Sequence, residues 1–178
     1  METTTPSAAP TRETLIAELN AKLLREQNLV LAIIAGAGAS IAGALIWMGI
    51  TIATQMHIGL VAIAVGAGVG YAVRFAGKGV EKIYGVIGAV FTLLSCLAGE
   101  VFTVIQFAAS ADNLGFFEAL GKVDYSILIP NILENSSAIT YLIYGIGVYE
   151  GYKLSFRKLT PAEIHEAGLS SATSAPAA

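Results

Sequence analysis

Long apolar blocks separated by short polar segments dominate the chain. Each block contains few or no charged residues, and most charged residues lie in the segments between and beyond the blocks. An α-helix needs about 20 apolar residues to cross a bilayer, so blocks of this length predict membrane spans. The fold class is therefore all-α, a polytopic membrane helix bundle with four transmembrane helices. The first three helices lie within 29–107 and the fourth within 138–155. The individual apolar blocks are 29–53, 58–75, 83–107 and 138–154.

The residues before the first span have a different pattern. In 11–28, Leu15, Ile16, Leu19 and Leu23 recur at helical spacing with charges on the other faces. This spacing predicts an N-terminal amphipathic helix at the membrane interface, either a plain lead-in to the first span or a docking site for a partner.

The two ends of the chain are polar. The first ten residues, 1–10, are small and polar with two prolines, which predicts a disordered tail. The carboxyl-terminal segment, 156–178, contains a brief helix signal, TPAEIHEAG, followed by a Ser/Ala/Pro-rich stretch that is also expected to be disordered.

The loops between the blocks are unequal in length. A very short turn at 55–57 joins the first two spans, and a second turn contains Gly77 and Gly79, which are expected to give it flexibility. The one sizeable loop, 108–137, contains two semi-apolar pieces. They predict short interfacial helices, split by Gly121 and broken at Pro130.

The basic residues give the orientation. Nine of the ten lysines and arginines lie before the first span, in the second turn or after the fourth span, and only Lys122 lies in the long loop. Because positive charge accumulates on the cytoplasmic side, both termini are expected to be cytoplasmic. The expected location is a bacterial inner membrane, with the lipid bilayer as the main partner.

Composition agrees with this assignment. Hydrophobic residues make up 55% of the chain and charged residues 13%, whereas soluble domains carry about 25% charged residues. The net charge of -3 leaves no basic face for nucleic acid. The one cysteine, Cys96, permits neither an internal disulfide nor a Cys-based zinc site. The first apolar block is too long for a signal-peptide core and is expected to be a retained span.

Small residues recur every four positions in each span. The pattern includes Gly66 and Gly70 in the second span and Gly147 and Gly151 in the fourth. Helices in lipid associate through close backbone approach at such positions, so these glycines predict helix packing. Contacts within the chain and contacts with another copy or a membrane-protein partner both fit the pattern.

Two glycine-rich motifs resemble phosphate-binding loops but lack their context. The segment VGAGVG lies in the middle of a span, whereas a dinucleotide loop follows a strand and opens a helix. The segment GKG lacks the Ser or Thr and the upstream glycine of a phosphate loop. No cofactor is predicted.

Glu100 is an ionisable residue inside the third apolar block. A charge at mid-bilayer costs about 3 kcal/mol on insertion scales, so its carboxyl group should face protein or water, or be protonated. One interpretation is an ion or proton site. The other is that the span ends near Glu100 and the carboxylate reaches water. Trp47, late in the first block, is expected to be an interfacial anchor.

Charged residues near the cytoplasmic ends suggest ion pairs or lipid contacts. Glu150 and Lys153 are one helical turn apart, and Arg74 is an alternative partner for Glu150 from the second span. Arg74, Lys78 and Lys82 together form a candidate contact for anionic lipid head groups.

No catalytic or metal-binding constellation is predicted. His57 and His165 lack partner ligands at useful spacing. No Ser/His/Asp or Cys/His arrangement is discernible, so an enzyme is not expected.

Several segments resemble an uncharacterised family of small four-span bacterial inner-membrane proteins. They are REQN before the first span, GALIW within it, VGYAVRFAGKG across the second turn, LLSCLAGE in the third span and YGIGVYEGYKLSFRKLT at the end. Some members of that family add an N-terminal zinc ribbon, which is absent here. The resemblance implies four spans and an inner membrane without implying an activity.

The sequence leaves two functional hypotheses. The first is a non-enzymatic interaction or scaffold component that self-associates. The alternative is a small transporter or channel component that uses Glu100 as a buried ion or proton site.

Overall fold

The structure, a computed structural model, describes residues 12–54 and 60–166, and within these ranges the regular elements are all helices. The predicted tail 1–10, the turn at 55–57 and the chain beyond residue 166 lie outside the described residues. The chain divides into two units, residues 28–157 and the two terminal segments 1–27 and 158–178. The helices are α1 (Arg12–Glu26), α2 (Leu29–Thr54), α3 (Leu60–Gly77), α4 (Lys82–Ala111), α5 (Phe116–Lys122), α6 (Tyr125–Asn135), α7 (Ala138–Leu154) and α8 (Pro161–Glu166).

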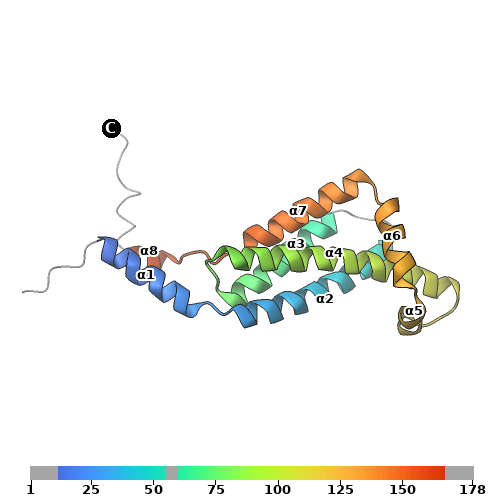
Figure 1. Cartoon of the computed structure of the whole chain (residues 1–178), viewed down its shortest axis with the longest axis horizontal. Helices are drawn as coiled ribbons and strands as arrows, with labels where there is room; N and C mark the ends of the chain where they lie inside the picture. Colours follow the sequence, from blue (N-terminus) through green and yellow to red (C-terminus); the bar gives the residue numbers. More distant parts are fainter. Residues whose placement is uncertain (1–11, 55–59, 167–178) are drawn as a thin grey trace, which may run out of the picture. The chain divides into compact units, whose positions relative to one another are not determined.

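Four helices of the first unit form a bundle. Helix α2 packs against α3 and α4. Helix α7 also packs against both α3 and α4 (Figure 1). Three of them, α2, α3 and α4, are long and apolar enough to cross a membrane. Helix α7 has 17 residues, a length of about 25 Å at 1.5 Å per residue. The predicted spans therefore match four packed helices, three of which have span length.

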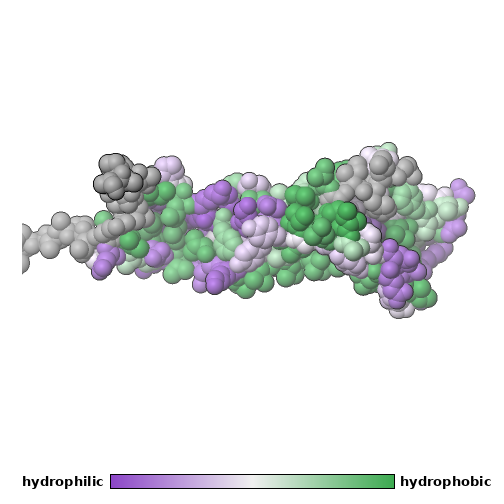
Figure 2. Space-filling view, turned by 90° about the horizontal axis from the view of Figure 1, so that it is seen from above, coloured by the Kyte–Doolittle hydropathy of each residue, from purple (hydrophilic) through white to green (hydrophobic). Residues whose placement is uncertain are grey.

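The bundle places small residues inside and large apolar residues outside. On α2 the buried residues are Ala32, Gly36, Ser40, Gly43, Ala44, Trp47 and Thr51. Ile34, Ile41 and Ile46 on the same helix are more than half exposed. Figure 2 shows the resulting hydrophobic surface over the bundle, with hydrophilic residues gathered toward its ends. Such an apolar exterior is unfavourable in water and is typical of a protein surrounded by lipid.

Glycines bring the backbones of α3 and α7 together. A Cβ on Gly66 would overlap the carbonyl group of Gly147, and a Cβ on Gly147 would lie 2.7 Å from the carbonyl oxygen of Ala62. One turn along, a Cβ on Gly70 would lie 2.9 Å from the carbonyl oxygen of Gly151. All four glycines singled out in the sequence thus lie in contacts within the chain.

The turn between α3 and α4 is shaped by packing against Tyr84 rather than by glycine flexibility. A Cβ on Gly79 would overlap the Tyr84 ring, and one on Gly77 would lie 2.8 Å from it. The left-handed residue is Lys78, with φ of 48°. Backbone N–H groups from both sides fix the turn: Asn28 donates to the Gly77 carbonyl (2.8 Å) and Arg157 to the Gly79 carbonyl (2.9 Å).

The long loop contains α5 and α6, as predicted, but its break points differ from the expected ones. Gly121 lies inside α5, and the two helices separate at Val123 and Asp124. Pro130 lies inside α6 without ending it. A proline in a helix removes a single backbone hydrogen bond. Here the Asp124 side chain caps α6 at its start, and the apolar residues of α6 pack toward α4.

The helix that contains the third apolar block is longer than the block. Helix α4 does not stop at Glu100 or at Phe107 but continues to Ala111. Its 30 residues give a length of about 45 Å, more than the roughly 30 Å hydrocarbon core of a bilayer. The last turns pack with α5 through Ile105, Ala109 and Ala119, which are buried together. This contact explains why the helix extends beyond the apolar block.

The terminal segments contain α1 and α8. On α1 the predicted apolar face is the covered one, with Leu19 and Leu23 buried. Helix α8 begins with a capping box: the Thr160 backbone N–H donates to Glu163 Oε2 (2.8 Å), and the Glu163 N–H donates to Thr160 Oγ1 (3.3 Å). The expected helix in TPAEIHEAG is therefore present.

Candidate functional site

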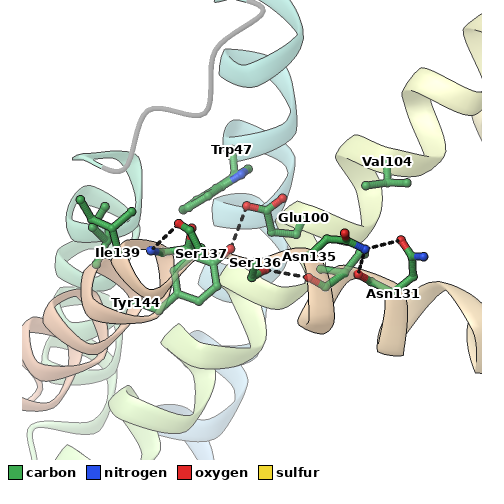
Figure 3. A pocket seen from close by; sticks show the side chains of 12 residues that line it. Trp47, Glu100, Val104, Asn131, Asn135, Ser136, Ser137, Ile139 and Tyr144 are labelled. Atoms are coloured by element: carbon green, nitrogen blue, oxygen red, sulfur yellow. Dashed lines mark hydrogen bonds between the residues drawn. The ribbon is translucent and has the colours of Figure 1, made fainter.

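The structure places Glu100 at a pocket of about 500 Å³ within the first unit. The pocket lies where α2, α4 and α7 meet the end of α6 (Figure 3). Of the twelve residues that line it, Glu100 alone carries a formal charge. The full lining is Trp47, Glu100, Val104, Asn131, Ile132, Asn135, Ser136, Ser137, Ile139, Thr140, Ile143 and Tyr144.

Three side chains from three different helices form the inner wall. The Tyr144 hydroxyl of α7 donates a hydrogen bond of 2.8 Å to Glu100 Oε1 of α4. The Tyr144 ring meets the Trp47 ring of α2 edge to face, with centroids 5.8 Å apart. Trp47 and Tyr144 are buried, and Glu100 is half-buried. Gly99 leaves room for this wall, since a Cβ there would lie 2.8 Å from Trp47 Cγ.

The indole nitrogen of Trp47 is buried and has no hydrogen-bond acceptor among the described residues. Such an unsatisfied donor costs about 1–3 kcal/mol, and most buried polar groups in proteins avoid this cost. In Figure 3 the nitrogen is at the end of the ring on the side of the Glu100 carboxylate. The inner wall thus contains one acid and one buried donor without an acceptor among the described residues.

The outer rim is polar but uncharged. The Asn135 amide nitrogen donates to the Asn131 carbonyl oxygen (2.8 Å), and the Ser136 hydroxyl donates to the Ile132 carbonyl oxygen (2.7 Å). The Ser137 side chain caps α7 by accepting from the Thr140 N–H (3.4 Å). These hydrogen bonds pair backbone groups at the end of α6 and at the start of α7, on the rim of the pocket that Glu100 lines.

Chemically, this arrangement can hold a proton or a positively charged group. A carboxylate in partly apolar surroundings is stabilised by hydrogen bonds, such as the one from Tyr144, by a group of opposite charge, or by protonation. Within the described residues, no three His, Cys, Asp or Glu side chains are grouped as metal ligands.

The basic candidates lie elsewhere, at the turn between α3 and α4. Lys78 and Lys82 are exposed, whereas Arg74 is half-buried and lies over the rings of Tyr71 (6.0 Å) and Phe75 (5.8 Å). Glu150 pairs with Lys153 of its own helix at 3.9 Å. Of the two partners predicted for Glu150, the structure therefore has the local one.

Sequence reasoning found Glu100 but not its partners. Trp47 was expected to be only an interfacial anchor, and Tyr144 is one of several tyrosines in the fourth block. One sequence feature could have pointed to this site. An acid, the single tryptophan and a group of tyrosines lie in three different apolar blocks, where polar or aromatic side chains can meet between helices. Without the helix register, nothing in the sequence joins Glu100 to a residue 44 positions away.

The fold and the pocket together define a helical protein compatible with membrane insertion, with an ionisable residue, Glu100, at a pocket of its bundle. Comparison with protein-family models, with curated proteins and with solved structures finds no match for this chain. The family resemblance noted in the sequence accordingly stays a prediction.

Proposed function

We propose that this protein is a four-span protein of a bacterial inner membrane. The three apolar helices support insertion. Helix α7 supports a fourth span because it packs alongside α3 and α4 and exposes Ile139, Leu142 and Ile146. Its 17 residues are at the short end of the range of about 17–25 residues for a transmembrane helix.

The charge distribution of the bundle supports cytoplasmic termini. The end formed by the α3–α4 turn and the last turn of α7 carries Arg74, Lys78, Lys82, Lys153 and Arg157. The opposite end, with α5 and α6, carries four acids and a single lysine. Lys78 and Lys82, with Arg74, would face anionic head groups of the inner leaflet. A cytoplasm-active reporter fused to the carboxyl terminus should give a signal, and a periplasmic signal would reject this topology.

We further propose a non-enzymatic role as a small transporter or channel component in which Glu100 binds a proton or another cation. The observation that carries this proposal is the Tyr144 hydrogen bond to Glu100 at the wall of the pocket. An acid inside an apolar bundle is costly to insert, and such residues commonly mark ion or proton pathways. Here the acid is oriented by a buried tyrosine and faces a cavity.

Flux measurements in proteoliposomes test this role. Wild-type protein should dissipate a proton or cation gradient faster than empty liposomes, and Glu100→Gln should abolish the difference. Glu118→Gln is the matched control, because Glu118 is an exposed acid paired with Lys122 outside the pocket (2.7 Å). Equal flux through wild type and Glu100→Gln would reject the proposal.

A second candidate is the interaction or scaffold role. It is favoured by Gly38 and Gly49 of α2, where an added Cβ would meet nothing within 4 Å. The two glycines lie 11 residues apart, which is close to three helical turns, so both lie on one outward stripe. A second copy or another membrane protein could pack there. Crosslinking should detect an oligomer that Gly38→Leu disrupts, and a strictly monomeric wild type would reject self-association.

A further inference from the structure

We infer that an apolar groove between α4 and α6 holds one acyl chain of a phospholipid from the outer leaflet. The groove has a volume of about 340 Å³. It is lined by five residues of α4, from Leu94 to Phe102, and by four residues of α6, from Tyr125 to Leu133. This inference rests on the proposed insertion of the bundle into a membrane and names a lipid that the bundle holds there.

The lining of the groove selects a hydrocarbon. Eight of the nine lining side chains have no polar atom. The ninth belongs to Tyr125, whose hydroxyl donates a hydrogen bond of 2.7 Å to the Leu120 carbonyl oxygen. A polar ligand would give up hydrogen bonds to water and find no replacement among these side chains, whereas an alkyl chain gives up none. Ordered water is also disfavoured, because it needs about two to four polar partners.

Helix α6 is held over the groove without filling it. Leu128 of α6 packs against the cluster that contains Ile105 of α4. Nearer the other end of α6, the Tyr141 hydroxyl of α7 donates a hydrogen bond of 2.5 Å to the Leu133 carbonyl oxygen. None of the residues of α6, all of which the structure describes, is buried, and Ile129 is 45% exposed. These two attachments fix α6 beside α4 and leave the space between them for an occupant.

The groove continues the exposed apolar stripe of α4. Val86, Val90 and Leu94 are each about half exposed and lie four residues apart. Leu97 and Val101, which line the groove with Leu94, follow at the same helical spacing. One face of α4 is therefore open to lipid along 86–94 and lies beside α6 along 97–101. An acyl chain in contact with the open part can extend into the groove without leaving apolar surface.

The length and direction of the groove fit a lipid tail. From Leu94 to Phe102 the groove extends about 12 Å along α4 at 1.5 Å per residue. One leaflet of a bilayer contributes about 15 Å, half of the hydrocarbon core of about 30 Å. Helix α6 runs across the end of the bundle (Figure 1), as expected of a helix that lies in the membrane interface. The groove thus has room for most of one acyl chain on the hydrocarbon side of that interface.

The groove does not select a head group, because its lining contains no charged residue. Phosphatidylethanolamine and phosphatidylglycerol should therefore occupy it equally well. This property separates the groove from the basic turn at Lys78 and Lys82, where anionic head groups are favoured.

Photolabelling of the full chain in nanodiscs tests the inference. The probe is a phospholipid with a diazirine on one acyl chain, and peptide mass spectrometry locates the adducts after irradiation. We expect adducts at α4 residues 94–102 and on α6. Ala98→Phe places a ring in the groove and should lower the yield there at least fivefold, while adducts at Val86 and Val90 persist. Ala42→Phe is the matched control, because Ala42 is an exposed residue of α2 outside the groove, and it should leave the yield unchanged.

Ile129→Phe provides a second test if Ala98→Phe does not fold. It fills the groove from the side of α6, and Ile129 is not part of a buried core. The yield in the groove should again fall at least fivefold. Probes with ethanolamine and with glycerol head groups should give groove yields that agree within twofold.

Three results would overturn the inference. They are an unlabelled groove in the wild type, undiminished labelling in the filled variants, and labelling that requires phosphatidylglycerol. Alkaline carbonate extraction of native membranes separates these failures from a failure of the proposed function. If the protein stays in the membrane, the proposed insertion stands and only the lipid inference is wrong. If carbonate releases the protein, the four-span proposal fails as well.

Discussion

The contact between α4 and α7 is tightly packed at one end and leaves a cavity at the other. Toward the basic turn, Gly88 and Gly151 let the helices touch through their backbones: a Cβ on Gly151 would lie 3.0 Å from the Gly88 carbonyl oxygen and would overlap the Thr92 hydroxyl. Toward the other end, Glu100 and Tyr144 face each other across the same pair of helices, and a cavity of about 500 Å³ remains beside them.

This difference shows how one helix pair can combine a tightly packed contact with an open pocket. In lipid, burying apolar surface does little to drive helix association, so close packing of small residues supplies much of the stabilisation. The close contacts at Gly70, Gly88 and Gly151, toward the basic turn, therefore hold α3, α4 and α7 in a fixed arrangement. The large and polar side chains at the other end leave space, and their positions are set by the packed end.

The largest expected effect comes from filling the glycine contact between α3 and α7. Gly66→Ala should destabilise the protein by about 1–3 kcal/mol, because its Cβ would overlap the Gly147 carbonyl and the helices would have to separate. Gly68→Ala, on the open face of the same helix, meets nothing within 4 Å and should stabilise by about 0.5–1 kcal/mol. Unfolding in mixed detergent measures both. Equal effects of the two substitutions would contradict the assigned helix faces.

A smaller effect is expected from the hydroxyl that links α4 to α2. Ser95 Oγ donates a hydrogen bond of 2.7 Å to the Ser40 carbonyl oxygen. Ser95→Ala should cost about 0.6 kcal/mol, the average for hydrogen bonds between membrane helices. The control is Ser110→Ala, because the Ser110 hydroxyl donates to Gln106 of its own helix and is exposed. A loss from Ser110→Ala as large as that from Ser95→Ala would contradict a stabilising hydrogen bond between α4 and α2.

The smallest effect is local and depends on pH. Hydrogen bonds from the Ser126 hydroxyl (2.6 Å) and backbone N–H (3.0 Å) to Asp124 lower the pKa of this carboxyl group. Because the folded pKa is below the unfolded value, the capping stabilisation is present above the unfolded pKa, about 3.9, and is lost as pH falls through the lowered folded pKa. Amide exchange of Ile127 and Leu128 should accelerate in that acidic range. Asp124→Asn should abolish this pH dependence, and unchanged acid sensitivity in the variant would contradict it.

Much of the bundle was predictable because its causes are local. The apolar blocks gave the helices within a few residues, and the four-residue spacing pointed to Gly66, Gly70, Gly147 and Gly151. The length of a block reflects the thickness of a bilayer, and the glycine spacing reflects the period of one helix. Neither signal requires tertiary information.

The remaining features depend on contacts between distant segments. The extension of α4 to Ala111 follows from its packing with α5, and the role of Gly79 follows from the position of the Tyr84 ring. Arg74 lies against aromatic rings of its own helix instead of pairing with Glu150. The pocket requires the register of α2, α4 and α7 together, which no local pattern contains.

The most direct test of the account is the side of the membrane from which the pocket is reached. Two single-cysteine variants are made in a Cys96→Ala background: Ser137→Cys at the exposed rim of the pocket, and Lys78→Cys at the basic turn. A membrane-impermeant maleimide is applied to intact cells and to inverted vesicles. Ser137→Cys is expected to react only from the periplasmic side and Lys78→Cys only from the cytoplasmic side. Labelling of both positions from one side would contradict a bundle that crosses the membrane with its Glu100 pocket opening outward.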